Sequence, residues 1–186
     1  MYADDTNITT TGSCIREIIT FANKDLVNIS EWLKANKLSL NVTKTERMFI
    51  GSDHNLVKIR NTPLLYLDKK PIKRVRVTKS LGVYIDERLS WLDHINNMSK
   101  KVSAGISGLR QVRHFVPMQT SITIYNSLIQ PLFDYCDVFW DNMPSTTAHR
   151  LQKLQNRAAR VITCQGYEVR SNEIRQQLEW KNRSEL

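Results

Sequence analysis

The spacing of apolar residues changes near residue 90, and this change constrains the fold of the 186-residue chain more than any other feature. Before residue 90, one helical stretch is followed by short apolar alternations between turn residues, a pattern typical of strands in an antiparallel sheet. After it, apolar residues recur every three or four positions in three stretches, which predict three amphipathic helices. The pattern therefore predicts an α+β fold, with helix and strands over residues 1–90 and an all-helical region over residues 91–186.

Local signals place the individual elements. Ser13 is suited to cap a first helix, whose apolar stripe covers residues 15–33 and which ends at Asn36. A short buried strand is expected over residues 48–50, and a small antiparallel element between residues 56 and 86. The three later helices are marked by apolar residues at helical spacing. The first has Ile95, Met98, Val102, Ile106 and Leu109; the second, after a cap near Thr120, has Ile122, Tyr125, Leu128, Ile129 and Leu132; the third has Leu151, Leu154, Ala158, Val161 and Ile162. Apart from these, the tail beyond Gly166 is compatible with a short helix around Ile174 and Leu178.

The charge of the chain indicates the class of its partner. The sequence carries 27 Lys and Arg against 18 Asp and Glu, a formal net charge of +9. Such an excess favours a polyanionic partner, which is either nucleic acid or an anionic membrane surface. No apolar run approaches the roughly 18 residues of a membrane-spanning helix, and no secretory leader precedes the first helix, so nucleic acid is the favoured partner.

The cysteines exclude a zinc site built on paired thiols. Cys14, Cys136 and Cys164 are odd in number and far apart, and no two of them are separated by the short spacing that a zinc site uses. This arrangement predicts three reduced thiols, buried or half-buried, in an intracellular protein.

The first residues place two carboxylates side by side, in the string Tyr2-Ala3-Asp4-Asp5. Mg²⁺ prefers carboxylate oxygens, and two-metal phosphoryl-transfer sites are built from them. A solvated turn is the alternative interpretation of so short a string, and the residues that follow decide against it. In chain order these are Trp32, Asn36, Leu38, Leu40-Asn41, Lys44-Thr45, Met48-Phe49, Leu81-Gly82-Val83 and Leu89-Ser90-Trp91. Together they resemble the C-terminal part of the reverse transcriptase of a non-LTR (LINE-type) retrotransposon, from motif C (YADD) through motifs D and E and the thumb.

The resemblance implies a fold, an activity and a site. Residues 1–90 would be a palm remnant, and residues 91–186 a helical thumb and connector. The complete enzyme would be an RNA-directed DNA polymerase that uses an RNA template, a DNA primer and deoxynucleoside triphosphates. Asp4 would be the firm ligand of two Mg²⁺ ions and Asp5 a secondary one, because adjacent residues in an extended segment point to opposite faces. Lys44 would lie near the leaving group of the incoming nucleotide.

Two groups of basic residues are candidates for contacts with nucleic acid. Residues 58–79 contain eight basic residues against Asp68 alone, and a motif E hairpin with Gly82 follows them. A second group forms a stripe on the third of the later helices. The candidate nucleic-acid-binding residues are Lys69, Lys70, Lys73, Arg74, Arg76, Lys79, Gly82, Arg150, Lys153, Arg157 and Arg160. A solvated surface without a partner is the alternative for both groups.

The resemblance does not include the fingers or the earlier Asp-bearing strand of a complete polymerase. It therefore implies a missing upstream half, and we expect the isolated chain to be inactive. We also expect it to act in the nucleus or in a cytoplasmic ribonucleoprotein. Two alternatives stay open: a non-catalytic basic module that binds nucleic acid, and a non-functional remnant of an element.

Overall fold

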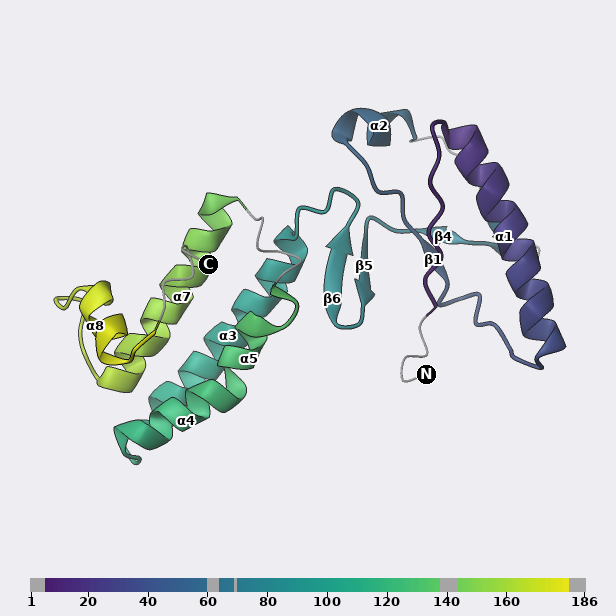
Figure 1. Ribbon diagram of the computed structural model, residues 1–186. Coiled ribbons are helices and arrows are strands. Elements are labelled where there is room, and N and C mark those ends of the chain that lie inside the picture. Colours follow the sequence, from purple (N-terminus) through teal and green to yellow (C-terminus); the bar gives the residue numbers. More distant parts are fainter. Residues whose placement is uncertain (1–5, 60–63, 69, 138–143, 181–186) are drawn as a thin grey trace. The chain divides into compact units, whose positions relative to one another are not determined.

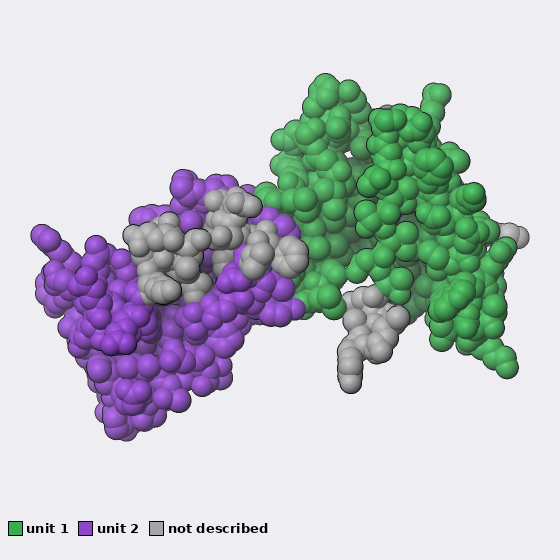
Figure 2. Space-filling view, in the orientation of Figure 1, with its two compact units in different colours: residues 1–90 green, residues 91–186 purple. Residues whose placement is uncertain are grey.

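The computed structural model describes residues 6–59, 64–68, 70–137 and 144–180 (Figure 1). The chain divides into two compact units, which are unit 1 (residues 1–90) and unit 2 (residues 91–186), drawn in green and purple in Figure 2. Helices and a few short strands together agree with the predicted α+β class. The assignment of the units to a palm and a thumb stays a prediction.

Unit 1 combines helices with paired short strands. Its described elements are α1 (Ile15–Ala35), β1 (Glu46–Arg47), α2 (Asp53–Lys58), β2 (Tyr66–Leu67), β3 (Lys70–Pro71), β4 (Lys73–Arg74), β5 (Val77–Ser80) and β6 (Val83–Asp86). The pairs β2–β3 and β5–β6 are antiparallel, whereas β1 and β4 pair in parallel. The predicted antiparallel element between residues 56 and 86 is therefore confirmed for β2–β3 and β5–β6, whereas β4 pairs with β1, a strand outside that range.

Helix α1 packs on the β2–β3 hairpin through the stripe that the sequence predicts. Ile19 and Leu26 are buried in one cluster with Leu65, Leu67 and Ile72. Asp68, which follows β2, also contacts this helix. Its carboxylate accepts hydrogen bonds from the Ser30 hydroxyl at 2.8 Å and from the Lys34 ammonium at 2.9 Å. These two hydrogen bonds, the one from Lys34 first, lower the pKa of Asp68.

The predicted C-terminal end of α1 is confirmed, whereas the predicted N-terminal cap is wrong. The helix ends at Asn36 as expected, and the Asn36 amide donates to the Trp32 carbonyl at 2.8 Å. The cap at the start is wrong, since Cys14 holds the N-cap position and the Ser13 hydroxyl donates to the Glu17 carboxylate instead, at 2.8 Å.

Two strand predictions in unit 1 are wrong. The strand lies at β1, before the predicted residues 48–50, and Ile50 is exposed. Residues 53–58 form the helix α2, where the apolar pattern indicated an extended segment. Short apolar runs do not separate buried strands from short helices, and Ser52 followed by Asp53 is a typical helix start.

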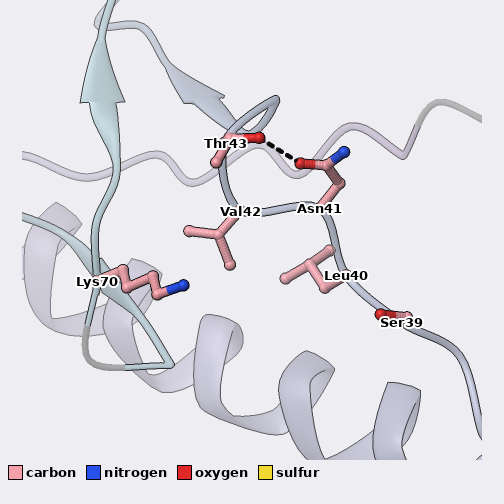
Figure 3. A pocket seen from close by; sticks show the side chains of 6 residues that line it. All are labelled: Ser39, Leu40, Asn41, Val42, Thr43 and Lys70. Atoms are coloured by element: carbon pink, nitrogen blue, oxygen red, sulfur yellow. Dashed lines mark hydrogen bonds between the residues drawn. The ribbon is translucent and has the colours of Figure 1, made fainter.

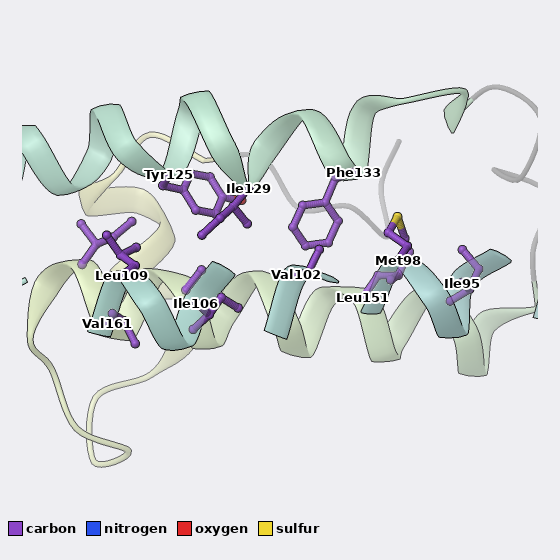
Figure 4. Close-up of a cluster of buried hydrophobic side chains, with 12 residues drawn as sticks. Ile95, Met98, Val102, Ile106, Leu109, Tyr125, Ile129, Phe133, Leu151 and Val161 are labelled. Carbon is purple, nitrogen blue, oxygen red and sulfur yellow. The ribbon is translucent and has the colours of Figure 1, made fainter. Parts of the chain in front are cut away.

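Unit 2 contains helices joined by turns and loops, and no strand, within its described residues. Its elements are α3 (Leu92–Val112), α4 (Met118–Leu128), α5 (Gln130–Asp134), α7 (Ser145–Thr163) and α8 (Ser171–Gln177). Helices α3, α4, α5 and α7 share one apolar core (Figure 4). All five residues predicted for α3 are buried in it, which confirms the helical period of that segment. None of the helices in the described part of the chain is long and apolar enough to cross a bilayer.

The second predicted helix is interrupted. It begins at Met118, two residues before the expected cap, and Ile129 ends α4 and also precedes α5. Pro131 lies in the first turn of α5. Backbone N–H groups in the first turn have no acceptor within the helix, so the missing N–H of proline costs no hydrogen bond there. Leu128 is consequently 68% exposed, although the helical stripe predicted it in the core.

The cysteine prediction holds in part. Cys14, Cys136 and Cys164 are all free thiols, as expected. Only Cys136 is half-buried, however, while Cys14 and Cys164 are exposed.

Gly105 marks a close approach of α3 to Ile129, the residue between α4 and α5, and its substitution gives a first prediction. A Cβ atom at Gly105 would lie 2.9 Å from Cγ1 of Ile129, whereas a Cβ at Gly108 would meet no atom within 4 Å. Gly105→Leu is expected to destabilise unit 2 by about 1–3 kcal/mol, the usual range for overpacking. The matched variant Gly108→Leu should be neutral or slightly stabilising, because Leu has about 1 kcal/mol better helix propensity than Gly. Urea unfolding monitored by circular dichroism measures both; equal effects would contradict the close packing.

Candidate nucleic-acid interface

The predicted metal ligands Asp4 and Asp5 lie outside the described residues. Within the ranges that the structure does describe, no three His, Cys, Asp or Glu side chains are grouped closely enough to hold a metal ion. The assignment of Asp4 and Asp5 therefore stays a prediction.

Lys44 lies in an exposed turn that Asn41 organises. The Thr43 hydroxyl donates to the side-chain oxygen of Asn41 at 2.6 Å, and the Thr45 hydroxyl donates to its carbonyl oxygen at 3.1 Å. The Lys44 backbone N–H donates to the same carbonyl, also at 3.1 Å. This turn and Lys70 of β3 line an open pocket of about 410 Å³ (Figure 3). The fold thus brings a second cation next to the segment that carries Lys44.

Four of the cations predicted on the strands are exposed. These are Lys70, Lys73, Arg76 and Lys79. The Lys73 ammonium lies 3.9 Å from the Glu46 carboxylate, a long and exposed pair of small energetic value. The Lys79 ammonium lies 5.9 Å from the centre of the Tyr84 ring on the paired strand. Lys69 falls outside the described residues.

Arg74 is engaged inside unit 1. Its guanidinium donates to the Ile59 carbonyl at 3.0 Å and lies 3.7 Å from the Glu87 carboxylate. It also lies 5.2 Å from the centre of the Phe49 ring, and the Arg47 guanidinium lies 5.5 Å from the same ring. Burial, and then the charge of Arg74, lower the pKa of Arg47. Arg74 is therefore less available to a partner than the exposed cations are.

A polar pocket of about 600 Å³ adds a cation that the sequence did not single out. It is lined by Asp53, Leu56, Val57, Arg74, Arg76, Glu87 and Arg88. The Arg88 guanidinium pairs with the Asp53 carboxylate at 2.6 Å. Asp86 and Glu87 precede Arg88 in the sequence, so the local charge gave no signal there. Its position beside Arg76 follows only from the fold.

The β5–β6 hairpin turns through two residues with positive φ. Leu81 has φ 47° and Gly82 has φ 87°, and Ser80 pairs with Val83 on either side of them. Positive φ at both positions is typical of a tight hairpin turn, which matches the twist of the strands. Glycine adopts this conformation without strain, whereas leucine does not. Gly82 is exposed at this turn, as a contact with a nucleic-acid backbone would require.

The predicted cations of α7 follow one face but differ in availability. Their spacing of three and four residues places Arg150, Lys153, Arg157 and Arg160 along one side of the helix. The Arg150 guanidinium donates to the Asn96 side chain at 2.6 Å. Lys153 is exposed and Arg157 half-buried. Arg160 is engaged within the unit, since it donates to the carbonyls of residues 166 and 169 and to the hydroxyl of residue 171.

Comparisons with known proteins identify relatives of one kind. The chain is 24% identical over 180 residues to a probable RNA-directed DNA polymerase from transposon X-element of Drosophila melanogaster, covering 95% of this chain and 19% of that protein. It is 24% identical over 181 residues to a probable RNA-directed DNA polymerase from transposon BS of the same species, covering 95% and 20%. It is 22% identical over 176 residues to the RNA-directed DNA polymerase from mobile element jockey of Drosophila funebris, covering 93% and 19%.

No family model matches the chain, and no solved structure shows significant similarity to it. The chain spans about a fifth of the length of the first of these relatives. Along nearly its whole length, the chain is similar to RNA-directed DNA polymerases of non-LTR retrotransposons, as its motifs predict.

Proposed function

We propose that this chain is part of an RNA-directed DNA polymerase of a non-LTR retrotransposon. Its similarity to such polymerases over 95% of its length carries the proposal. Because it spans about a fifth of them, polymerisation is a property of a longer protein, and the 186-residue chain alone incorporates no nucleotides. The substrates of the longer protein are an RNA template, a DNA primer and deoxynucleoside triphosphates.

In the longer protein, Asp4 and Asp5 hold Mg²⁺, because carboxylate oxygens are the donors that this ion prefers. When bound, the metal ions supply activation of the attacking hydroxyl and neutralisation of the leaving group. Lys44 adds a positive charge near the phosphates of the incoming nucleotide. The exposure of Lys44 and the hydrogen bonds that fix its turn support this role.

The strands of unit 1 bind the phosphates of the primer and template. Lys70, Lys73, Arg76 and Lys79 support this proposal because they are exposed; Lys70, Lys73 and Lys79 lie on the short strands β3, β4 and β5, and Arg76 lies between β4 and β5. Contacts of this kind are independent of base sequence and weaken as salt rises. A second candidate function, a non-catalytic nucleic-acid-binding module, is favoured by the same exposed cations, since they need no metal ion to act.

Removing two of these cations gives a second prediction. The double variant Lys73→Ala/Arg76→Ala is expected to reduce the slope of log affinity against log salt by up to about 1.8 on duplex DNA, or about 0.9 for each phosphate that the protein no longer neutralises. The matched control is Arg16→Ala/Lys24→Ala, which removes two exposed cations of α1. Fluorescence anisotropy with a labelled primer–template at several salt concentrations measures the slope.

The control variant changes the net charge by the same amount, so general attraction falls equally in both proteins. A reduced slope for the strand variant alone places phosphate contacts on the strands. Equal slopes in the two variants would remove the strands from the binding surface.

A further inference from the structure

The basic residues of unit 2 outnumber its acidic residues, by 12 to 8. Between Asp93 and Asp134 the sequence contains four Lys and Arg residues and no acidic residue, and the same is true between Asp141 and Glu168. The ion pairs found among the described residues all lie in unit 1. Exposed cations on the described helices of unit 2 are therefore available to an anionic partner; these include Lys100, Lys101, Arg110 and Lys153.

Two aromatic side chains of unit 2 are almost fully exposed. Phe115 follows α3 and is 86% exposed, and Tyr167 follows α7 and is 85% exposed. Transfer of a large aromatic side chain out of water is favourable, and nearly all of the Phe115 side chain is in contact with solvent. Two such residues, in a unit whose basic residues outnumber its acidic ones, indicate a partner with flat apolar groups and negative charge.

The fold brings these two residues to the same end of unit 2, although 52 positions separate them in the sequence. The Arg113 guanidinium, at the end of α3, donates to the Val161 carbonyl in the last turn of α7 at 3.2 Å. Figure 4 shows Leu109 and Val161 together at one end of the packed helices. The segments that carry Phe115 and Tyr167 start from these two joined helix ends.

Tyr167 is held in place by the arginine beside it. The Arg160 guanidinium lies 5.0 Å from the centre of the Tyr167 ring. The same guanidinium donates to the carbonyl of Gly166, to the carbonyl of Val169 at 2.9 Å and to the Ser171 hydroxyl at 3.0 Å. These acceptors are two carbonyls and a hydroxyl, which carry no negative charge to offset that of the guanidinium. Fixing the loop in advance lowers the entropy lost when a ligand stacks on the ring.

We propose that this end of unit 2 binds the unpaired bases of a single-stranded nucleic acid, which stack on Phe115 and Tyr167. Arg110, an exposed cation near the end of α3, contacts the phosphates. Aromatic platforms in a positive surface are the usual means of binding single strands without sequence preference. Bases in a duplex are already stacked on one another and cannot use such a platform. This site is separate from the strand cations of unit 1 and requires no polymerase activity.

The test separates stacking from attraction between charges. The full chain is titrated into a labelled oligothymidine and into an abasic oligomer of the same length, which has the same phosphates and no bases. The double variant Phe115→Ala/Tyr167→Ala is expected to bind oligothymidine at least about tenfold more weakly, since each stacked base contributes about 1–3 kcal/mol. Its affinity for the abasic oligomer and its salt slope should not change.

Two further variants complete the test. Phe21→Ala/Trp32→Ala removes two exposed aromatic side chains of α1 and should leave both affinities unchanged. Phe115→Trp/Tyr167→Phe keeps two aromatic rings and should restore the binding of oligothymidine. Because both target side chains are exposed, the thermal unfolding midpoint should stay that of the parent.

Equal affinity of the parent chain for the two oligomers would overturn this inference and leave the proposed contacts with phosphates intact. An equal loss for both oligomers in the alanine variant would also overturn it. Failure of the parent to bind either oligomer would also overturn this inference, whereas the strand cations of unit 1 are tested separately, on the duplex primer–template.

Discussion

An Asp4→Ala substitution is expected to abolish Mg²⁺-dependent primer extension by a protein that carries this chain in frame behind the upstream part of a related polymerase. The carboxylate of Asp4 is the proposed firm ligand of the metal ions, and no other group in the string Tyr2-Ala3-Asp4-Asp5 can replace it in that position. Loss of a charged group that acts in the transition state typically lowers the rate by a factor of about 10³ or more. Single-turnover primer extension on an RNA template measures the rate.

Companion variants make this experiment specific. Asp5→Ala should be severe but less complete, because adjacent carboxylates face opposite ways in an extended segment. Lys44→Ala should slow the chemical step with little effect on duplex affinity. Glu31→Ala, which removes an exposed carboxylate from α1, should have no effect. The 186-residue chain without the upstream part should incorporate nothing.

Two results would contradict the proposed catalytic role. An Asp4→Ala fusion that extends primers as fast as its parent would show that the motif C assignment is wrong. Templated incorporation by the pure 186-residue chain would show that the upstream part is not needed. The first result would leave the non-catalytic binding module as the better description of the chain.

Phe133→Ala is expected to destabilise unit 2 by about 3–5 kcal/mol, the range found when a buried Phe is truncated. Phe133 is fully buried, and Figure 4 shows its ring pointing from α5 toward Val102 of α3. Removal of the ring leaves a cavity between these helices that side chains at fixed helix positions cannot fill. A loss of this size is a large part of the roughly 5–15 kcal/mol that stabilises a typical domain.

The matched control for Phe133→Ala is Phe115→Ala, the same chemical change at a side chain that is 86% exposed. Its effect on stability should stay within about 0.5 kcal/mol. Urea unfolding followed by circular dichroism gives both values. Similar midpoints for the two variants would mean that the helices of unit 2 do not form a tightly packed core around Phe133.

The helices could be predicted where their own sequence determines the burial pattern. In α3, the residues from Ile95 to Leu109 face one core at a regular spacing, so the local pattern was sufficient. The pairing of β1 with β4 could not be predicted in this way. It joins Glu46 to Lys73 in parallel over two residues, which is too short for an alternating pattern and too far apart for a turn signal.

In the candidate interface, too, some features could be predicted from the sequence and others depend on the fold. The exposure of Lys73 and Arg76 agrees with the excess of basic residues in their segment. The engagement of Arg74 and Arg160 by carbonyl groups could not be predicted, because those acceptors come from loops whose course depends on the fold. Arg88 could not be predicted either, because the acidic residues directly before it offset its charge in the sequence pattern.

The turn between β5 and β6 also matters for anyone who wishes to engineer this protein. Leu81 sits there with φ 47° and 62% exposed, a backbone conformation that costs an L-residue roughly 1–2 kcal/mol. A screen that selects for heat resistance alone would therefore favour Gly or Asn at position 81, since both tolerate this conformation. It would also remove the large apolar side chain from the tip of the hairpin. A thermostable version of unit 1 and a version that keeps the natural surface of this hairpin are thus different design targets.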